Sequence, residues 1–441
     1  MLFAARWQVP ADRRSRRVAG PVSVEEAIGR LRPGMRVLLP PGCGEPTPLI
    51  GEVVRQAERL RPLTLMGGLH LSGHPFCAPE HDGRLRWVTF HAMPGLRDAL
   101  GRGQAEFVPL RYFDAPWAFG PSGPWAADAI LVQTAPPDEA GRLSLGVSTS
   151  YPLPVARVAP LVIAEVNRQM PRTRGDSTIE MDRVAAWVET DRPLVSYGAP
   201  SIGEVERQIA AHVAELVPDG ATIQVGIGAT PEAVVAGLHG HRDLGVHSAL
   251  FDAMLPLLQS GAITGARNRR HPGCLDVGEI MGTASLFEWA HENPQVHMEA
   301  STTIHDPKVV AGIERFVSIN SAIEIDLTGQ VNAEAVGDRQ VAGIGGQFDF
   351  VAGAALGGHR SVIALPSTGR RGGVSRIVAR LGAGTPVTTP RYLVDCVVTE
   401  FGRAELRGRT DSQRAHALIR LAHPSFRESL EREWRAGRQA F

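Results

Sequence analysis

The chain has 441 residues, of which 43% are apolar and 21% are charged, and its 46 basic residues balance its 46 acidic ones. This length exceeds that of one typical core, so we expect a globular protein of two domains. The zero net charge argues against a nucleic-acid partner, which would require a basic surface. The basic cluster RRSRR (13–17) lies in a terminal segment and is interpreted as solvated charge.

The cysteines and the apolar runs indicate the compartment. Four cysteines stand far apart without a CxxC pattern: Cys43, Cys77, Cys274 and Cys396. No apolar run approaches the roughly 20 residues that span a bilayer. The N-terminal segment also lacks the apolar core of a signal peptide. We therefore predict a reduced, cytoplasmic protein with no membrane partner.

Short continuous apolar runs, which are typical of buried parallel strands, punctuate the first half of the chain. They are MRVLLP (35–40), LTLMG (63–67), AILVQT (129–134) and PLVIAEV (160–166). Helical patterns such as SVEEAIGRL (23–31) and PLIGEVVRQAERL (48–60) lie between them. This alternation predicts a first α/β domain over residues 20–195, with VETDRPLVSYGAP (188–200) as the linker.

The same alternation restarts after the linker. PSIGEVERQIAAHVAELVPDG (200–220) has a helical apolar face that ends at PDG, and a strand and a helix follow in ATIQVGIG and TPEAVVAGL. Later segments are strand-like: FVSINSAIEIDLTG (316–329), RSVIALPS (360–367) and CVVTEFG (396–402). The tail RESLEREWRAGRQAF predicts a charged terminal helix. The second α/β domain is expected over residues 200–430, repeating the order of the first.

Three glycine-rich loops are candidates for ligand binding. In IQVGIGATPEAVV, Gly226 and Gly228 precede a helix N-terminus, which favours anionic groups, although a plain turn has the same pattern. AGIGGQFDFVAGAALGG (342–358) offers unshielded amides suited to an oxyanion hole, or a tight loop beneath a helix. ALPSTGRRGGVSR (364–376) would hold phosphates or form a solvated turn.

The sequence predicts no metal site. The segment HLSGHPFCAPEH holds three histidines and a cysteine: His70, His74, Cys77 and His81. They would suit zinc on a helix, but Gly73 and two prolines favour a loop. HPGC (271–274) is a weaker candidate still, and His247 and His297 are interpreted as hydrogen-bonded core histidines. Serine-hydrolase, Walker A and dinucleotide-binding motifs are also missing from the sequence.

Taken together, the segments resemble the acetyl-CoA hydrolase/transferase family, the single-chain relatives of class I CoA-transferases, over about residues 22–428. The resemblance rests on QTAPPDEAGRLSLGVSTSY, VIAEVNRQMPRT, IGEVE, QVGIGATPEAV, LGVHSALFDAMLPLLQSGAITG, INSAIEIDLTGQVNAEAVG, GIGGQFDFVAGA, IALPST, VTTPR, VVTEFGRAELRG and AHPSFR. It implies two α/β domains of CoA-transferase type with acyl-CoA bound as substrate in the cleft between them. It further implies a homo-oligomer with no permanently bound cofactor.

The resemblance also implies which residues bind CoA and the acyl group. They are Gly226, Ile227, Gly228, Ala229 and Thr230 of one loop, Ala342, Gly345 and Gly346 of the next, and Arg370. The Gly346 amide would lie near the thioester. The aromatic- and proline-rich segment YFDAPWAFGPSGPW (112–125) falls where the family lines its cleft.

Two positions depart from the family pattern. In GVHSALFDAM (245–254), Ala249 stands where the family carries the glutamate that attacks the thioester and then holds CoA. A methyl group can do neither. In TTIHDPKVV, His305 stands where the family usually has an asparagine that orients this glutamate.

These departures lead to several hypotheses. In the first, His305 activates water or another acceptor (a carboxylate, alcohol or amine) for direct attack on the thioester, and the Gly346 amide holds the oxyanion. In the structural alternative, His305 is neutral and bonds Asp306 or the backbone. A second hypothesis keeps CoA transfer with a substitute carboxylate, namely Asp252, Glu279 or Glu299. A third is a non-catalytic acyl-CoA-binding protein or subunit.

Overall fold

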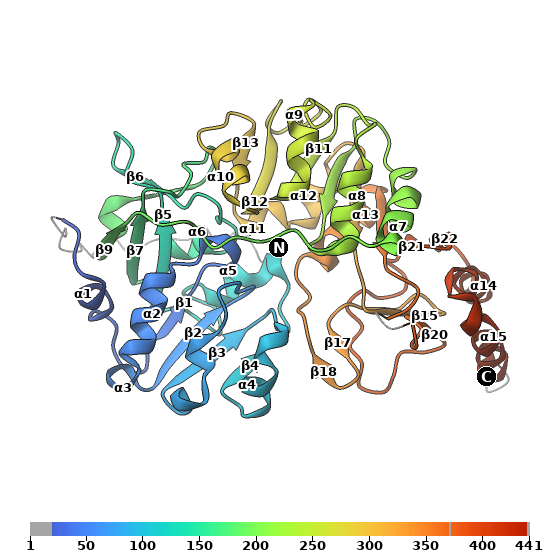
Figure 1. Cartoon of the computed structure of the whole chain (residues 1–441), viewed down its shortest axis with the longest axis horizontal. Coiled ribbons are helices and arrows are strands. Elements are labelled where there is room, and N and C mark those ends of the chain that lie inside the picture. Colours follow the sequence, from blue (N-terminus) through green and yellow to red (C-terminus); the bar gives the residue numbers. More distant parts are fainter. Residues whose placement is uncertain (1–19, 370–371, 439–441) are drawn as a thin grey trace.

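The computed structural model describes residues 20–369 and 372–438, and a seven-stranded parallel sheet organises its first half (Figure 1). In spatial order the strands are β4 (Ala105–Phe107), β3 (Leu85–Thr89), β2 (Leu63–Gly67), β1 (Arg36–Leu38), β5 (Ala129–Thr134), β7 (Leu161–Asn167) and β9 (Ala186–Thr190). The helices are α1 (Val24–Ile28), α2 (Thr47–Arg55), α3 (Ala57–Leu60), α4 (Arg97–Gly101), α5 (Ala115–Phe119) and α6 (Pro152–Ala156).

Both faces of this sheet are buried, which explains the continuous apolar runs in its strands. Successive side chains of one strand enter different clusters: Val37 and Leu39 pack with α1, α2 and α3. Leu38 packs on the other face with α5 and α6. An antiparallel pair, β6 (Arg142–Ser144) and β8 (Thr178–Glu180), lies beside the sheet.

An eight-stranded sheet organises the second half. In spatial order its strands are β13 (Val296–Met298), β12 (Leu275–Met281), β11 (Gly245–Phe251), β10 (Thr222–Val225), β14 (Phe316–Asn320), β19 (Arg360–Ala364), β21 (Cys396–Thr399) and β22 (Gly402–Glu405). Only the last pair, β21 and β22, runs antiparallel within it.

The helices of the second half are α7 (Glu204–Ala214), α8 (Ala229–Gly237), α9 (Leu255–Gln259), α10 (Ala284–Ala290), α11 (Ser301–Ile304), α12 (Pro307–Ala311), α13 (Gln347–Gly357), α14 (Asp411–Leu421) and α15 (Pro424–Arg438). Short strands β15 (Glu324–Asp326), β16 (Val331–Asn332) and β20 (Ile377–Val378) form a small sheet, and β17 (Ala335–Val336) pairs with β18 (Arg339–Gln340).

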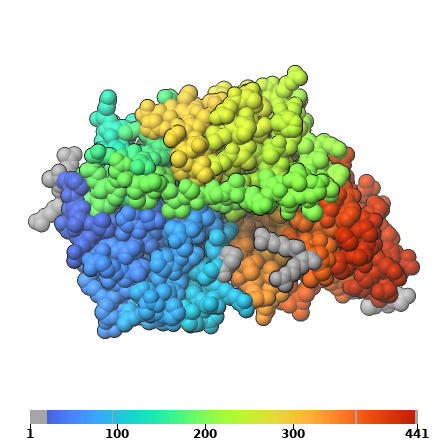
Figure 2. All heavy atoms as spheres, viewed as in Figure 1, coloured from blue at the N-terminus to red at the C-terminus, as the bar shows by residue number. Residues whose placement is uncertain are grey.

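The two large sheets share one strand order. In each, the first strand lies inside the sheet, the next three extend to one side, and the chain then returns to the other side. Residues 191–203 carry no helix or strand and cross from one half to the other (Figure 1). Figure 2 shows this segment on the surface of the molecule. The predicted α/β architecture is confirmed, whereas the domain limits of 20–195 and 200–430 remain predictions.

In the ranges 20–369 and 372–438, no helix combines the length and the apolar character required to cross a bilayer. Arg370, expected among the residues that bind CoA and the acyl group, lies outside the described residues.

Candidate active site

A cavity of about 360 Å³ lies where residues of both halves meet. From the first half it is lined by Pro41, Gly42, Leu69, His91, Tyr112 and Ser150. From the second half it is lined by the ends of β10, β11, β12 and β14 and by the glycine loop before α13. β10 and β14 are neighbours at the point where the strand order reverses. Ligands of open α/β sheets bind at such switch points, beyond the carboxyl ends of the strands.

Ala249 reaches the cavity on an irregular part of β11. The pairing of β11 with β12 shifts between Ser248 and Ala249, and Ser248 has a φ of 102°. A non-glycine residue with positive φ is strained, and such residues concentrate at functional sites. The bulge brings both residues into the cavity lining.

Glu279 on β12 presents a carboxyl group to the same cavity and pairs with Ala249 across the ladder. The Ser150 hydroxyl donates to Glu279 Oε1, and the Tyr112 hydroxyl lies 3.4 Å from the same oxygen. Burial raises the pKa of Glu279 to about 8, against the opposing effect of these hydroxyl donors. At neutral pH, Glu279 is therefore mainly a neutral carboxylic acid.

His305 ends α11 and is buried in the cavity lining. Its ring stacks on Tyr112 with centroids 4.8 Å apart and lies 4.6 Å from the ring of Phe350. Nδ1 faces Asp349 Oδ2 at 3.6 Å, which is an ion-pair distance longer than a hydrogen bond. Asp306, the partner considered from the sequence, instead caps α12 by accepting from the Lys308 amide.

Asp349 is itself held by the first half. It accepts from the Phe113 amide at 3.2 Å and from Arg111 Nη1 at 3.3 Å. Burial raises the pKa of Asp349, while His305 and Arg111 favour its charged form and oppose that rise. The side chain is fully buried on α13, so its position is set by both halves of the molecule.

The glycine loop before α13 passes directly over His305. The Tyr112 amide donates to the Gly345 carbonyl at 3.0 Å, which joins this loop to the first half. A Cβ on Gly346 would lie 2.3 Å from His305 Cε1, so only glycine allows this approach. The Gly346 amide stands at the N-terminus of α13, where helix amides lack intrahelical acceptors.

The other residues expected from the sequence fall in or beside this cavity. Gly226, Ile227 and Ala342 join Gly345 and Gly346 in its lining. Gly228 precedes α8, with a φ of 118°, and Ala229 and Thr230 form its first turn next to the lining.

Two of the three substitute carboxylates lie elsewhere. Asp252 accepts from the Thr283 amide at 3.0 Å, and Glu299 bonds Arg270 at 2.5 Å. His247 is a core histidine whose Nε2 lies 2.7 Å from the Ile304 carbonyl. His70 is buried beside Glu45, within the loop for which a metal was considered.

Sequence reasoning did not identify four residues of this arrangement: Arg111, Tyr112, Ser150 and Asp349. Tyr112 begins the aromatic segment that was expected to line the cleft, so part of the signal was present. Ser150 and Asp349 lie inside segments used for the resemblance, but nothing in their local pattern indicates a role. Their importance comes from contacts between residues more than 100 positions apart.

Comparisons with known proteins identify the family of the chain. The family model for the acetyl-CoA hydrolase/transferase N-terminal domain matches residues 12–197, and that for its C-terminal domain matches residues 282–434. The chain is 38% identical to 4-hydroxybutyrate coenzyme A transferase of Clostridium kluyveri, covering 94% of this chain and 97% of that one. It is 37% identical to succinyl-CoA:acetate/propanoyl-CoA:succinate CoA transferase of Fasciola hepatica, covering 92% and 86%.

A solved structure is similar over nearly the whole length. RipA from Yersinia pestis superposes with a TM-score of 0.90 and 32% identity, covering 95% of this chain and 97% of that one. The expected family is thereby confirmed: the chain belongs to the acetyl-CoA hydrolase/transferase family.

Proposed function

We propose that this protein is an acyl-CoA-processing enzyme that passes the acyl group directly from the thioester to an acceptor, with His305 as the base. Family membership supports acyl-CoA as the substrate. The observation that carries the proposal is the pairing of His305 with buried Asp349 beside Gly346 in the cavity. Water as the acceptor would make the enzyme a hydrolase, and an alcohol or amine would make it an acyltransferase.

The pairing supports a defined role for each ring nitrogen of His305. A carboxylate facing Nδ1 favours the tautomer protonated on Nδ1, which leaves the lone pair on Nε2. Catalytic contacts in ligand-free enzymes are often long and tighten when substrate binds, so 3.6 Å is compatible with this role. Nε2 then takes a proton from the acceptor as it attacks the thioester carbonyl.

Glu279 supplies the complementary acid. Since its pKa lies near 8, it carries a proton at neutral pH and can give that proton to the departing CoA sulfur. The acceptor forms the new bond to the acyl carbon, the C–S bond breaks, and Glu279 protonates the thiolate. The Gly346 amide donates to the carbonyl oxygen as negative charge develops there. Proton exchange with solvent then deprotonates His305 and reprotonates Glu279.

A second candidate is conventional CoA transfer with Glu279 as nucleophile. It is supported by the position of Glu279 opposite Ala249 and in the cavity lining, which neither Asp252 nor Glu299 joins. The ionised carboxylate would attack the thioester to form a mixed anhydride and then hold CoA as a glutamyl thioester. The raised pKa weighs against it, because attack requires the anion.

The experiment measures CoA release from acetyl-CoA and butyryl-CoA, with and without acetate, for the wild type, His305→Ala and Asp349→Asn. We expect His305→Ala to lower kcat by about 10²–10⁴-fold, which is the usual contribution of a general base. His239→Ala is the matched control, because His239 is an exposed histidine outside the cavity. Full turnover by His305→Ala would rule out the base.

Chemical trapping of covalently bound CoA distinguishes direct acyl transfer from CoA transfer through Glu279. Direct transfer leaves no covalent CoA, so borohydride or hydroxylamine treatment during turnover should neither label nor inactivate the enzyme. Labelling that disappears in Glu279→Gln would instead establish the transferase mechanism. Binding of CoA without turnover by the wild type would support the non-catalytic hypothesis and reject both.

A further inference from the structure

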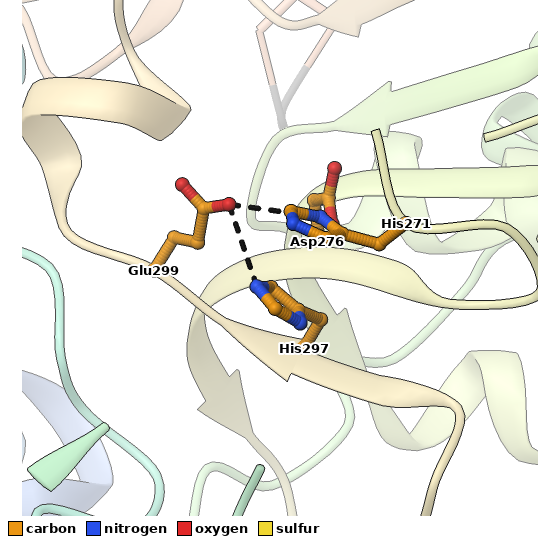
Figure 3. A group of neighbouring side chains, drawn as sticks. All are labelled: His271, Asp276, His297 and Glu299. Atoms are coloured by element: carbon orange, nitrogen blue, oxygen red, sulfur yellow. Dashed lines mark hydrogen bonds and ion pairs between the residues drawn. The ribbon is translucent and has the colours of Figure 1, made fainter. Parts of the chain in front are cut away.

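Four potential metal ligands converge at the outer edge of the eight-stranded sheet, away from the acyl cavity. They are His271, Asp276, His297 and Glu299, and one ligand atom of each lies within 4.8 Å of the others. Figure 3 shows the side chains of His297 and Glu299 directed toward His271 and Asp276. We propose that this cluster is a structural zinc site with two imidazole and two carboxylate ligands.

The sheet itself brings three of these residues together. Asp276 on β12 pairs with His297 on β13, the edge strand, so the two are lateral neighbours on one face. Glu299 follows His297 by two positions and therefore shares that face. Such a juxtaposition cannot be recognised from sequence spacing, because it depends on the strand register.

The fourth ligand comes from a turn that folds back over the edge. The Cys274 amide donates to the His271 carbonyl at 2.9 Å, and Gly273 has a φ of 79°. The side chain of Asn268 accepts from the His271 amide at 3.1 Å. These bonds hold His271 above β12, with Nδ1 2.7 Å from Asp276 Oδ1.

Two of the separations are longer than direct hydrogen bonds and are close to the spacing of ligands around an ion. His297 Nε2 and His271 Nδ1 face the same oxygen, Glu299 Oε1, at 3.5 and 3.7 Å. Hydrogen bonds of this kind are usually about 2.7–3.2 Å long. Zinc bonds of about 2.1 Å in a tetrahedron separate the ligand atoms by about 3.4 Å. The two imidazole rings stack with centroids 3.5 Å apart.

The two carboxylates carry more negative charge than the neighbouring arginine balances, which favours binding of a cation. The carboxylates of Asp276 and Glu299 are 5% and 9% exposed, and Arg270 supplies one positive charge at 2.5 Å from Glu299 Oε1. Arg270 is 35% exposed and can move toward solvent when a metal binds Glu299.

The surroundings of the cluster indicate how an ion would reach it and what role the ion would have. Asp276 and Arg270 line a separate cavity of about 240 Å³, which gives an ion a route to the ligands. None of the four ligands lines the acyl cavity. Four protein ligands leave no open position on zinc, which is the pattern of structural rather than catalytic sites. The ion would fasten the turn at 271–274 to the edge strand and displace the proton that His271 shares with Asp276.

The test uses the purified full-length protein produced with zinc in the medium. After desalting, we expect one zinc equivalent per chain by elemental mass spectrometry, and a Tm that falls on EDTA treatment and recovers on adding zinc chloride. Cobalt in place of zinc should give the visible absorption of a tetrahedral site. His297→Ala and Glu299→Gln should weaken zinc binding by more than about 100-fold, the upper range for losing an outer-shell partner.

His239→Ala is the matched control and should keep its zinc, since this exposed histidine lies outside the cluster. The wild-type measurements need no variant, so a poorly folding mutant does not weaken the test. A wild type without stoichiometric zinc, and with a Tm indifferent to zinc and EDTA, would show that the cluster is only an ion-pair network. Zinc retained by both ligand variants would equally overturn the site.

Discussion

At the scale of single residues, the informative pair is Ala249 and Glu279. The resemblance places a nucleophilic carboxylate at position 249, and the neighbouring strand presents one from position 279 instead. The two positions face each other across β11 and β12, yet the chemistry they permit differs. Because burial outweighs the opposing effect of the Ser150 and Tyr112 hydroxyls, Glu279 holds a proton at neutral pH, which suits an acid better than a nucleophile.

If Glu279 acts as the acid, we expect kcat to fall at alkaline pH, where its carboxyl group loses the proton. The acid form is lost as pH rises through about 8, so the kcat of the wild type should fall above that pH. Glu279→Gln should have a lower kcat without this alkaline decline, as measured by CoA release across a pH series. Glu45→Gln is the control, because Glu45 is also buried, with a pKa raised to about 7, but does not line the cavity. An unchanged alkaline limb in Glu279→Gln would contradict the acid role.

The raised pKa of Glu279 also makes the free energy of unfolding depend on pH. The folded value of about 8 lies above the ordinary value of 4.5, so the folded state binds more protons between these pH values. The contribution of Glu279 is fully present below pH 4.5 and is lost as pH rises to 8. Relative to the wild type, Glu279→Gln should therefore become more stable as pH increases across this window.

At the scale of elements, the bulge in β11 is the feature that turns a strand into part of the site. Its sequence, GVHSALF, would continue as an ordinary buried strand. The shifted register and the positive φ of Ser248 bend it toward the cavity. Backbone strain of this kind usually costs about 1–3 kcal/mol and persists where surrounding contacts impose it.

Substitution of Ser248 tests that strain. Glycine tolerates φ 102°, so Ser248→Gly should leave the free energy of unfolding unchanged or raise it, whereas Ser248→Val should lower it by at least about 1 kcal/mol. Chemical denaturation measures both. Ser260→Gly is the control, since Ser260 has an ordinary φ of −78° and should lose about 0.5–1 kcal/mol. Equal destabilisation by Ser248→Gly and Ser260→Gly would argue against strain.

Several elements were predictable because their patterns are local. The predicted strand PLVIAEV (160–166) corresponds to β7. The helical pattern in 200–220 corresponds to α7, and the charged tail corresponds to α15. The bulge was not predictable, because it depends on how β11 pairs with β12. The proposed zinc ligands share this property, since Asp276 and His297 meet only through the register of two strands.

At the scale of the molecule, the candidate active site exists only where the halves meet. Tyr112 and Ser150 come from the first half, whereas Glu279, His305 and Asp349 come from the second. Arg111 crosses between them to reach Asp349, and its neighbour Tyr112 bonds the Gly345 carbonyl. The placement of the proposed catalytic groups therefore depends on the docking of the two sheets.

Substitution of Arg111, a proposed positioning residue, tests whether the site depends on contacts between the two halves. Without its guanidinium, Asp349 loses its cationic partner and its pKa rises further, so it orients His305 less well. Arg111→Ala should lower kcat by up to about 100-fold, the effect of a small misplacement, with a smaller change in KM and partial rescue by Arg111→Lys. Arg157→Ala is the control, because its exposed ion pair with Asp176 lies within the first half. A kcat equal to that of the wild type would refute the positioning role.

The sequence by itself determined the α/β class, the repeated alternation and the family, and it drew attention to Ala249 and His305. These follow from local apolar patterns and collinear motifs, which need no knowledge of distant contacts. Only the tertiary structure decided that Glu279 faces the cavity, that Asp349 faces His305 and that four potential metal ligands converge at the sheet edge. Each of these depends on register, burial and charge among residues far apart in the chain, and none of those quantities has a local pattern.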